Sequence, residues 1–163
     1  MKKVKPQIKT IGHSNKQITE FLDTLQKHEI EMVVDVRTIP RSRFSPHFNE
    51  KPLGSALAKR SIKYLNRGQN LGGRGVNVGY EEAIEELVEL ARQGVRICVM
   101  CSEADYRNCH RYSALTPSFY SHDVEVFHIE YAKTVNRAKN TTLQTPHNLK
   151  KVKKPNPKQS KLL

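Results

Sequence analysis

The sequence lacks the features of several protein classes. No apolar run approaches the ~20 residues needed to span a membrane, and the basic N-terminus, residues 1–6, has no apolar stretch like that of a signal peptide. Three cysteines do not make the disulfide framework of a small secreted domain. We find no internal repeat. These absences argue against membrane-spanning, disulfide-rich and repeat proteins, and we expect a cytoplasmic protein with no membrane partner.

Acidic residues are absent from residues 131–163, where nine Lys or Arg lie among prolines and polar residues. The chain carries a formal net charge of +12, but residues 1–130 contain 19 basic residues against all 16 acidic ones. The C-terminal segment has too little apolar surface to offset the entropy of ordering. We therefore expect a single α/β domain over residues 1–130 and a basic, flexible tail over residues 131–163. Such a tail either binds polyanions or only solubilises the protein.

Apolar periodicity predicts strands that alternate with helices. We expect strands at 8–11, 32–36, 62–65, 95–100 and 124–129, and helices after residue 14, at 53–60, at 81–93 and from 109 onward. Ser14 and Gln17 fit a capping box, Pro117 should kink or end the last helix, and five glycines within residues 67–79 predict a mobile loop. The alternation predicts a Rossmann-like three-layer α/β domain with a mostly parallel sheet of about five strands.

Three loops that follow predicted strands are dense in polar residues: residues 13–15, 35–43 and 101–111. In a parallel sheet these loops meet at the carboxyl edge, where ligands bind. Helix N-termini and arginine side chains there would favour an anion. We therefore predict a site for a phosphate-bearing small molecule or nucleic acid, although the polar residues could instead cap a helix and pair with carboxylates. The residues expected to bind the anion are His13, Ser14, Asn15, Arg37, Arg41 and Arg111.

The loop from Cys101 to Arg111 carries the candidate catalytic residues. Glu103 and His110 are candidate acid and base groups, because a carboxylate over a sheet edge beside an imidazole can be shifted towards neutrality. His110 could instead bond Glu103 and fix the turn. Cys101 is a candidate nucleophile, since Cys101 to Arg107 matches the C-x5-R phosphate loop. The match is weak, because the loop contains two carboxylates and lacks the usual glycines.

A metal site is the less favoured interpretation of the same thiols. Cys101, Cys109, His110 and His13 could bind zinc chemically, but their spacing matches no common zinc motif. We therefore predict no metal, and the sequence indicates no cofactor. Cys109 is expected to pack its helix onto the sheet, and Cys98 to lie buried within its strand.

Six short segments in order, spanning roughly residues 10–129, resemble a known family. They are Thr10-Ile-Gly-His-Ser-Asn15, Val34-Asp-Val-Arg37 with Pro40-Arg41, Phe48-Asn49, Leu71-Gly-Gly73, Cys101-x-Glu103 and Cys109-His-Arg111. Together they resemble the domain of unknown function family 488, the YeaO-like group. The resemblance implies a compact α/β domain and supplies no reaction. The residues that it carries over are His13, Ser14, Asn15, Asp35, Arg37, Pro40, Arg41, Cys101, Glu103, Cys109, His110 and Arg111.

Three functions remain open from the sequence. The converging polar loops favour an enzyme acting on a phosphate-bearing substrate, a nucleotide or nucleic acid, at the carboxyl edge of the sheet. The tail and the basic residues 37–74 favour a non-catalytic nucleic-acid-binding module, although no stacked-aromatic motif indicates sequence-specific RNA reading. A regulatory protein with a vestigial pocket is the third. Glu103 favours the enzyme, because a site that only binds phosphate has little use for a carboxylate.

Overall fold

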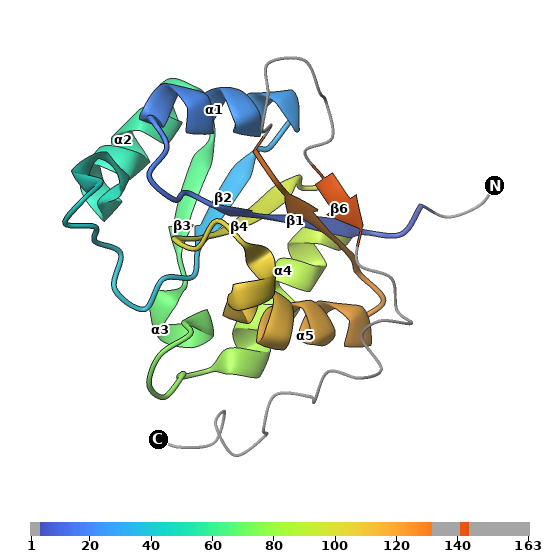
Figure 1. Ribbon diagram of the computed structural model, residues 1–163. Helices are drawn as coiled ribbons and strands as arrows, with labels where there is room; N and C mark the ends of the chain where they lie inside the picture. The colour runs from blue at the N-terminus through green and yellow to red at the C-terminus, as the bar shows by residue number, and fades with distance from the viewer. Residues whose placement is uncertain (1–3, 132–140, 144–163) are drawn as a thin grey trace.

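The structure is a computed structural model that describes residues 4–131 and 141–143. Five parallel strands form the sheet, as predicted: β1 (Gln7–Gly12), β2 (Met32–Asp35), β3 (Lys63–Asn66), β4 (Ile97–Cys101) and β5 (Glu125–Ile129) (Figure 1). A short strand, β6 (Thr141–Leu143), pairs antiparallel with β5. It lies within the segment predicted to be a flexible tail, and the rest of that prediction lies outside the described residues.

Helices cover both faces of the sheet, which confirms the Rossmann-like α/β architecture. One face carries α1 (Ile18–Lys27) and α2 (Glu50–Lys59), and the other carries α4 (Tyr80–Arg92) and α5 (Thr116–Ser121) (Figure 1). The shorter turns are η1 (Pro46–Phe48), α3 (Gly68–Leu71), η2 (Tyr106–Asn108) and the π-helical turn η3 (Arg111–Leu115). Among the described residues, none of these helices has the length and apolarity to cross a membrane.

The strand order is β3-β2-β4-β1-β5-β6, so the carboxyl ends of β1 and β4 lie side by side. The chain leaves β1 towards β2 through α1, and leaves β4 in the opposite direction, towards β5, through α5. Crossovers in parallel sheets are right-handed, so these two connections lie on opposite faces of the sheet. In open α/β sheets, ligands bind at the carboxyl ends of the strands near such a divergence.

Side chains of β4 show how the strand pleat divides the core. Cys98 and Met100 pack with α1 and α2, whereas Ile97, Val99 and Cys101 pack with α4 and α5. Burial of Cys98 within its strand is confirmed, since its side chain is fully inaccessible. Cys101, on the other face, meets the chain segment that returns after η2.

The ends of two helices differ from the first expectation. The capping box at Ser14 does not form, and the first helix begins slightly later, at Ile18, as a start at Gln17 with Glu20 allows; Gln17 makes no side-chain cap bond, and Ser14 has a left-handed backbone with φ 51°. Pro117 does not end the last helix but lies in the first turn of α5, where its missing N–H costs no hydrogen bond. The N–H and hydroxyl of Thr116 both bond the carbonyl of Arg111 across the π-helical turn.

The expectation of a mobile loop over residues 67–79 was also incomplete. Residues 68–71 form α3, and a Cβ at Gly68 would lie 2.0 Å from the carbonyl oxygen of Arg37. The glycine therefore allows close approach of two loops rather than local mobility. That contact brings the loop after β3 to the same edge as the loop after β2.

Candidate functional site

A cavity of about 490 Å³ lies at the carboxyl edge of the sheet. Its size is typical of small-molecule sites, which span roughly 300–1,000 Å³. The loops after β2, β3 and β4 form its walls, which include arginines, a carboxylate, two thiols and an imidazole. The lining residues are Arg37, Thr38, Ile39, Arg41, Gly73, Arg74, Cys101, Ser102, Glu103, Asn108, Cys109 and His110.

Two thiols face each other at the base of this cavity. Cys101 Sγ lies 2.9 Å from Cys109 Sγ, and both cysteines are free. Cys109 Sγ is also 3.5 Å from His110 Nδ1 and accepts the backbone N–H of Arg111 at 3.5 Å. A thiol–thiol contact this short requires a shared proton, so one sulfur is the donor and the other the acceptor.

Arg111 is a further donor to Cys109. Its side chain is fully buried, and its Nε donates to Cys109 Sγ at 3.4 Å. The other donors go to neutral oxygens, namely Thr10 Oγ1 at 3.1 Å and the Glu103 carbonyl at 2.6 Å. No carboxylate within residues 4–131 pairs with this guanidinium. A buried cation requires a counter-charge, and the sulfur of Cys109 is the group placed to supply it.

The two thiols therefore have opposite electrostatics. The hydrogen bond from Cys101 holds the pKa of Cys109 far below its usual value of 9.0, with further help from His110 and Arg111. The same hydrogen bond, together with burial, raises the pKa of the Cys101 thiol. These opposite shifts favour ionisation of Cys109 before Cys101. Thiolates are the reactive form of cysteine.

A second buried charge network lies at the end of β2. Asp35, fully buried, accepts from Arg37 Nε at 2.9 Å and Nη2 at 2.7 Å, and from the hydroxyl of Tyr64 at 2.6 Å. Arg37 Nη1 lies 3.3 Å from His13 Nε2. Burial lowers the pKa of His13 to about 4. Its Nδ1 donates to the Ser14 carbonyl at 2.6 Å, so the lone pair of Nε2 faces Arg37.

Glycines allow the loops to close around the site. A Cβ at Gly12 would lie 1.7 Å from the Glu103 carbonyl oxygen, and one at Gly73 would lie 2.8 Å from His110 Nδ1. The Cys101–Arg111 loop therefore crosses directly over the end of β1, and the imidazole of His110 rests on the backbone of the loop before α4. These contacts explain why glycines stand within two of the segments that resemble the family.

The family model for the domain of unknown function DUF488 matches residues 17–78 and 76–115. The chain belongs to this family. The match covers the loops after β2, β3 and β4 that enclose the cavity, and ends within η3. His13, Ser14 and Asn15 lie outside the matched residues. Searches of curated proteins and of solved structures gave no match.

The structure brings most of the residues proposed for the site to one edge of the sheet. Arg37, Arg41, Cys101, Glu103 and His110 line the cavity. His13 lies beside Arg37, behind the cavity wall, and Arg111 lies beneath Cys109. Ser14 and Asn15 share the edge but not the cavity.

Two earlier interpretations of the Cys101–Arg111 loop need revision. Arg107 is paired with Asp105 through bonds of 2.9 and 3.0 Å, so it does not hold an anion over Cys101 as a C-x5-R loop requires. Glu103 Oε1 accepts the N–H of Asp105 at 3.1 Å and fixes the turn by itself rather than through His110. Cys109 packs against the core beneath α4 and α5, as expected, and also lines the cavity. Its place in the Cys-His-Arg segment was a sequence signal for a role at the site.

The zinc arrangement does not form within the described part of the chain, where no group of three His, Cys, Asp or Glu side chains could hold a metal ion. His13 directs one ring nitrogen at Ser14 and the other at Arg37, which leaves none for a metal. The guanidinium of Arg111 beside the thiols would also repel a cation.

Proposed function

We propose that this protein is an enzyme that holds a phosphate-bearing substrate, a nucleotide or nucleic acid, in the carboxyl-edge cavity and attacks it with the Cys109 thiolate. The observation that carries the proposal is the hydrogen bond that the buried Arg111 donates to Cys109 Sγ at 3.4 Å. A thiolate held by fixed donors at a cavity wall needs no reorganisation before it reacts.

The cavity walls suit an anion. Arg41 and Arg74 line it and form no ion pair with any residue in 4–131, whereas Arg37 is held by Asp35. Guanidinium groups bind phosphate through two parallel hydrogen bonds. The substrate phosphate would therefore lie towards the arginines and its reacting atom towards Cys109 Sγ.

The reaction class is nucleophilic displacement. Cys109 Sγ forms a bond to the electrophilic atom, and the leaving group departs with the electron pair of the broken bond and then takes a proton. His110, with Nδ1 3.5 Å from the sulfur, and Glu103, on the cavity wall, are the groups placed to donate that proton and to activate the water that releases the adduct. Cys101 stabilises the thiolate as its hydrogen-bond donor.

Alkylation with iodoacetamide, followed by peptide mapping, tests the proposal. Cys109 should react at a nearly constant rate between about pH 5 and 9, whereas an ordinary thiol gains about tenfold per pH unit over most of this range. Inorganic phosphate or a mononucleotide should slow the reaction, and Cys101→Ala, which removes the donor, should restore a steeper pH dependence. A wild-type rate that climbs tenfold per pH unit, or no protection by either anion, would contradict the proposal.

A second candidate is the non-catalytic nucleic-acid-binding module, which would use the basic loops and the tail. It is favoured by Arg41, Arg43 and Arg74, whose guanidiniums pair with no carboxylate within residues 4–131. The two candidate functions predict different effects of alkylating Cys109. A pure binder would keep its affinity for an oligonucleotide after alkylation of Cys109, whereas a bulky group at the catalytic sulfur would weaken binding to the enzyme.

A further inference from the structure

Large apolar side chains are exposed beside the cavity. The described residues include five exposed large hydrophobics, and four of them, Ile39, Phe44, Val76 and Val78, lie on two loops, residues 38–45 and 72–79. Phe44 is 92% exposed. The loops touch where Thr38 Oγ1 accepts the N–H of Arg74 at 3.1 Å. We call these two loops, which meet at Thr38 and Arg74, the rim.

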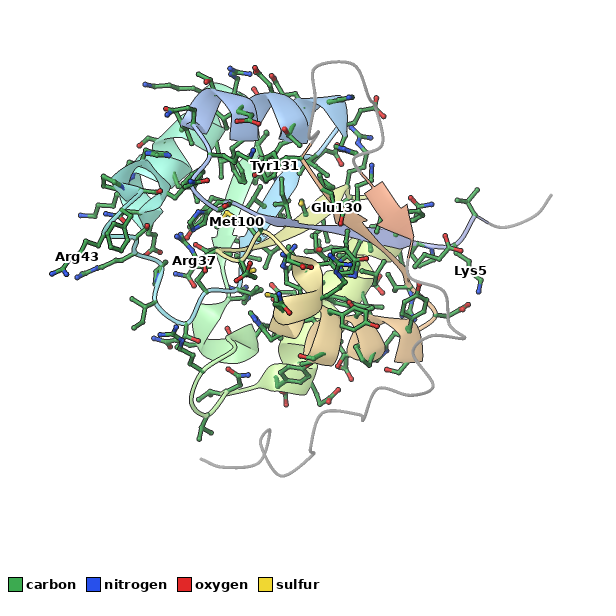
Figure 2. The ribbon with its side chains drawn as sticks, in the orientation of Figure 1. Lys5, Arg37, Arg43, Met100, Glu130 and Tyr131 are labelled. Carbon is green, nitrogen blue, oxygen red and sulfur yellow. The ribbon has the colours of Figure 1, made fainter. Side chains whose placement is uncertain are left out.

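The same two loops carry basic side chains. Arg41 and Arg43 precede Phe44 on one loop, and Arg74 lies on the other. Figure 2 shows Arg43 projecting outward from the connection between β2 and α2, away from Arg37. Glu50 is the only acid within residues 37–80, and its carboxylate accepts from Asn66. The rim thus combines apolar surface with positive charge that no described carboxylate neutralises.

Internal hydrogen bonds hold the Phe44 loop in place. Ser42 N donates to Asn49 Oδ1 at 2.7 Å, Ser45 N donates to Ser42 Oγ at 3.0 Å, and Glu50 N donates to the Pro40 carbonyl at 3.1 Å. Ser45, directly after Phe44, is buried. The loop therefore holds Phe44 towards solvent, where its ring is accessible to a ligand.

We propose that these loops bind single-stranded nucleic acid, with one base stacked on Phe44 and neighbouring phosphates on Arg41, Arg43 and Arg74. Base–aromatic stacking beside a positive groove is how proteins hold single strands without reading their sequence. A duplex is a poorer fit, because its base faces are already stacked. A further claim rests on the proposed function: the bound strand places one phosphate in the cavity beside Cys109.

Tryptophan fluorescence gives a signal specific to this position. The chain contains no tryptophan, so Phe44→Trp creates a single reporter whose emission should be quenched by stacking against an oligothymidylate of about 12 nucleotides. Val4→Trp is the control, because Val4 is the remaining exposed hydrophobic and lies at the opposite edge of the sheet. Binding through the C-terminal tail alone would quench neither reporter. Equal quenching of both, or of neither, would overturn the stacking proposal.

Affinity supplies the second measurement. Phe44→Ala in the full chain should weaken binding of a fluorescent oligothymidylate by about 5- to 100-fold, as loss of one stacked base does. Phe44→Tyr should retain affinity, and Val4→Ala should leave it unchanged. Unchanged binding in Phe44→Ala, or equal binding of single strand and duplex, would overturn the proposal.

Alkylation separates this inference from the proposed function. Quenching in Phe44→Trp together with protection of Cys109 by the oligonucleotide supports both the surface and its link to the thiolate. Quenching without protection overturns delivery of a phosphate to Cys109, while the stacking surface stands. An ordinary pH dependence of Cys109 alkylation would overturn the proposed enzyme and leave the quenching result unaffected.

Discussion

The two edges of the sheet are both hollowed, yet they differ in how their charges are held. A cavity of about 660 Å³ at the amino edge is larger than the carboxyl-edge cavity of about 490 Å³. Its nearby ion pairs, Lys5–Asp123 and Arg96–Glu31, are solvent-exposed. At the carboxyl edge, Asp35 and Arg111 are fully buried, and Arg111 donates to the sulfur of Cys109. The two cavities therefore differ more in the desolvation of their charged groups than in volume.

The largest expected difference between the edges follows from removing the buried cation. Arg111→Met should lower the free energy of unfolding by about 3 kcal/mol, the lower end for breaking a buried charge pair, because Cys109 can become neutral by taking up a proton. Chemical denaturation measures the loss, and alkylation should show the pKa of Cys109 moving up. If the variant is as stable as the wild type and its Cys109 still reacts at low pH, buried charge does not distinguish the carboxyl edge from the amino edge.

Backbone contacts provide the next test. Gly12→Ala should destabilise the protein by about 2 to 3 kcal/mol, because its Cβ would collide with the backbone of Glu103. Gly94, at the amino edge, has φ +89° and open space around it, so Gly94→Ala should cost only about 1 kcal/mol through backbone strain. Thermal unfolding of both variants compares the edges directly. Equal losses would mean that the loops do not close tightly over β1.

Acid should weaken the carboxyl edge through His13. The folded pKa of His13 is about 4, below the ordinary 6.5, so the unfolded chain takes up a proton that the folded protein refuses. The stability contribution is complete above about pH 6.5 and falls as the pH drops towards 4. Between pH 7 and about 4.5, the free energy of unfolding of His13→Gln should fall by about 2 kcal/mol less than that of the wild type, as measured by urea denaturation. Burial also lowers the pKa of His28, directly after α1, to about 4, so His28→Gln should change in the same direction.

The smallest effect should come from the amino edge itself. Arg96→Ala removes a half-exposed partner of Glu31 and should change the free energy of unfolding by less than about 1 kcal/mol. Its remaining small effect should shrink further in high salt. A loss as large as that of Arg111→Met would show that exposure does not distinguish the two edges.

Much of this protein could be predicted from its sequence. Apolar periodicity is local, so it indicated the five parallel strands and the main helices within a few residues. The parallel arrangement then placed three polar loops at one edge, where Arg37, Arg41, Cys101, Glu103 and His110 do line one cavity. Errors arose where distant contacts override local preference, as at Ser14, at Pro117 and in the glycine-rich loop that contains α3.

Only the tertiary structure distinguished the two thiols by their electrostatics. From the sequence, Cys101 was the candidate nucleophile through its C-x5-R match, and Cys109 was expected to pack its helix onto the sheet. The pKa of Cys109 is the lowered one because its sulfur accepts from Cys101 at 2.9 Å and from the buried Arg111 at 3.4 Å. The pKa of a buried group depends on charges and donors brought together by the fold, and the spacing of residues along the chain does not specify these. The sequence determined which side chains reach the carboxyl edge; packing determined which of them carries the charge.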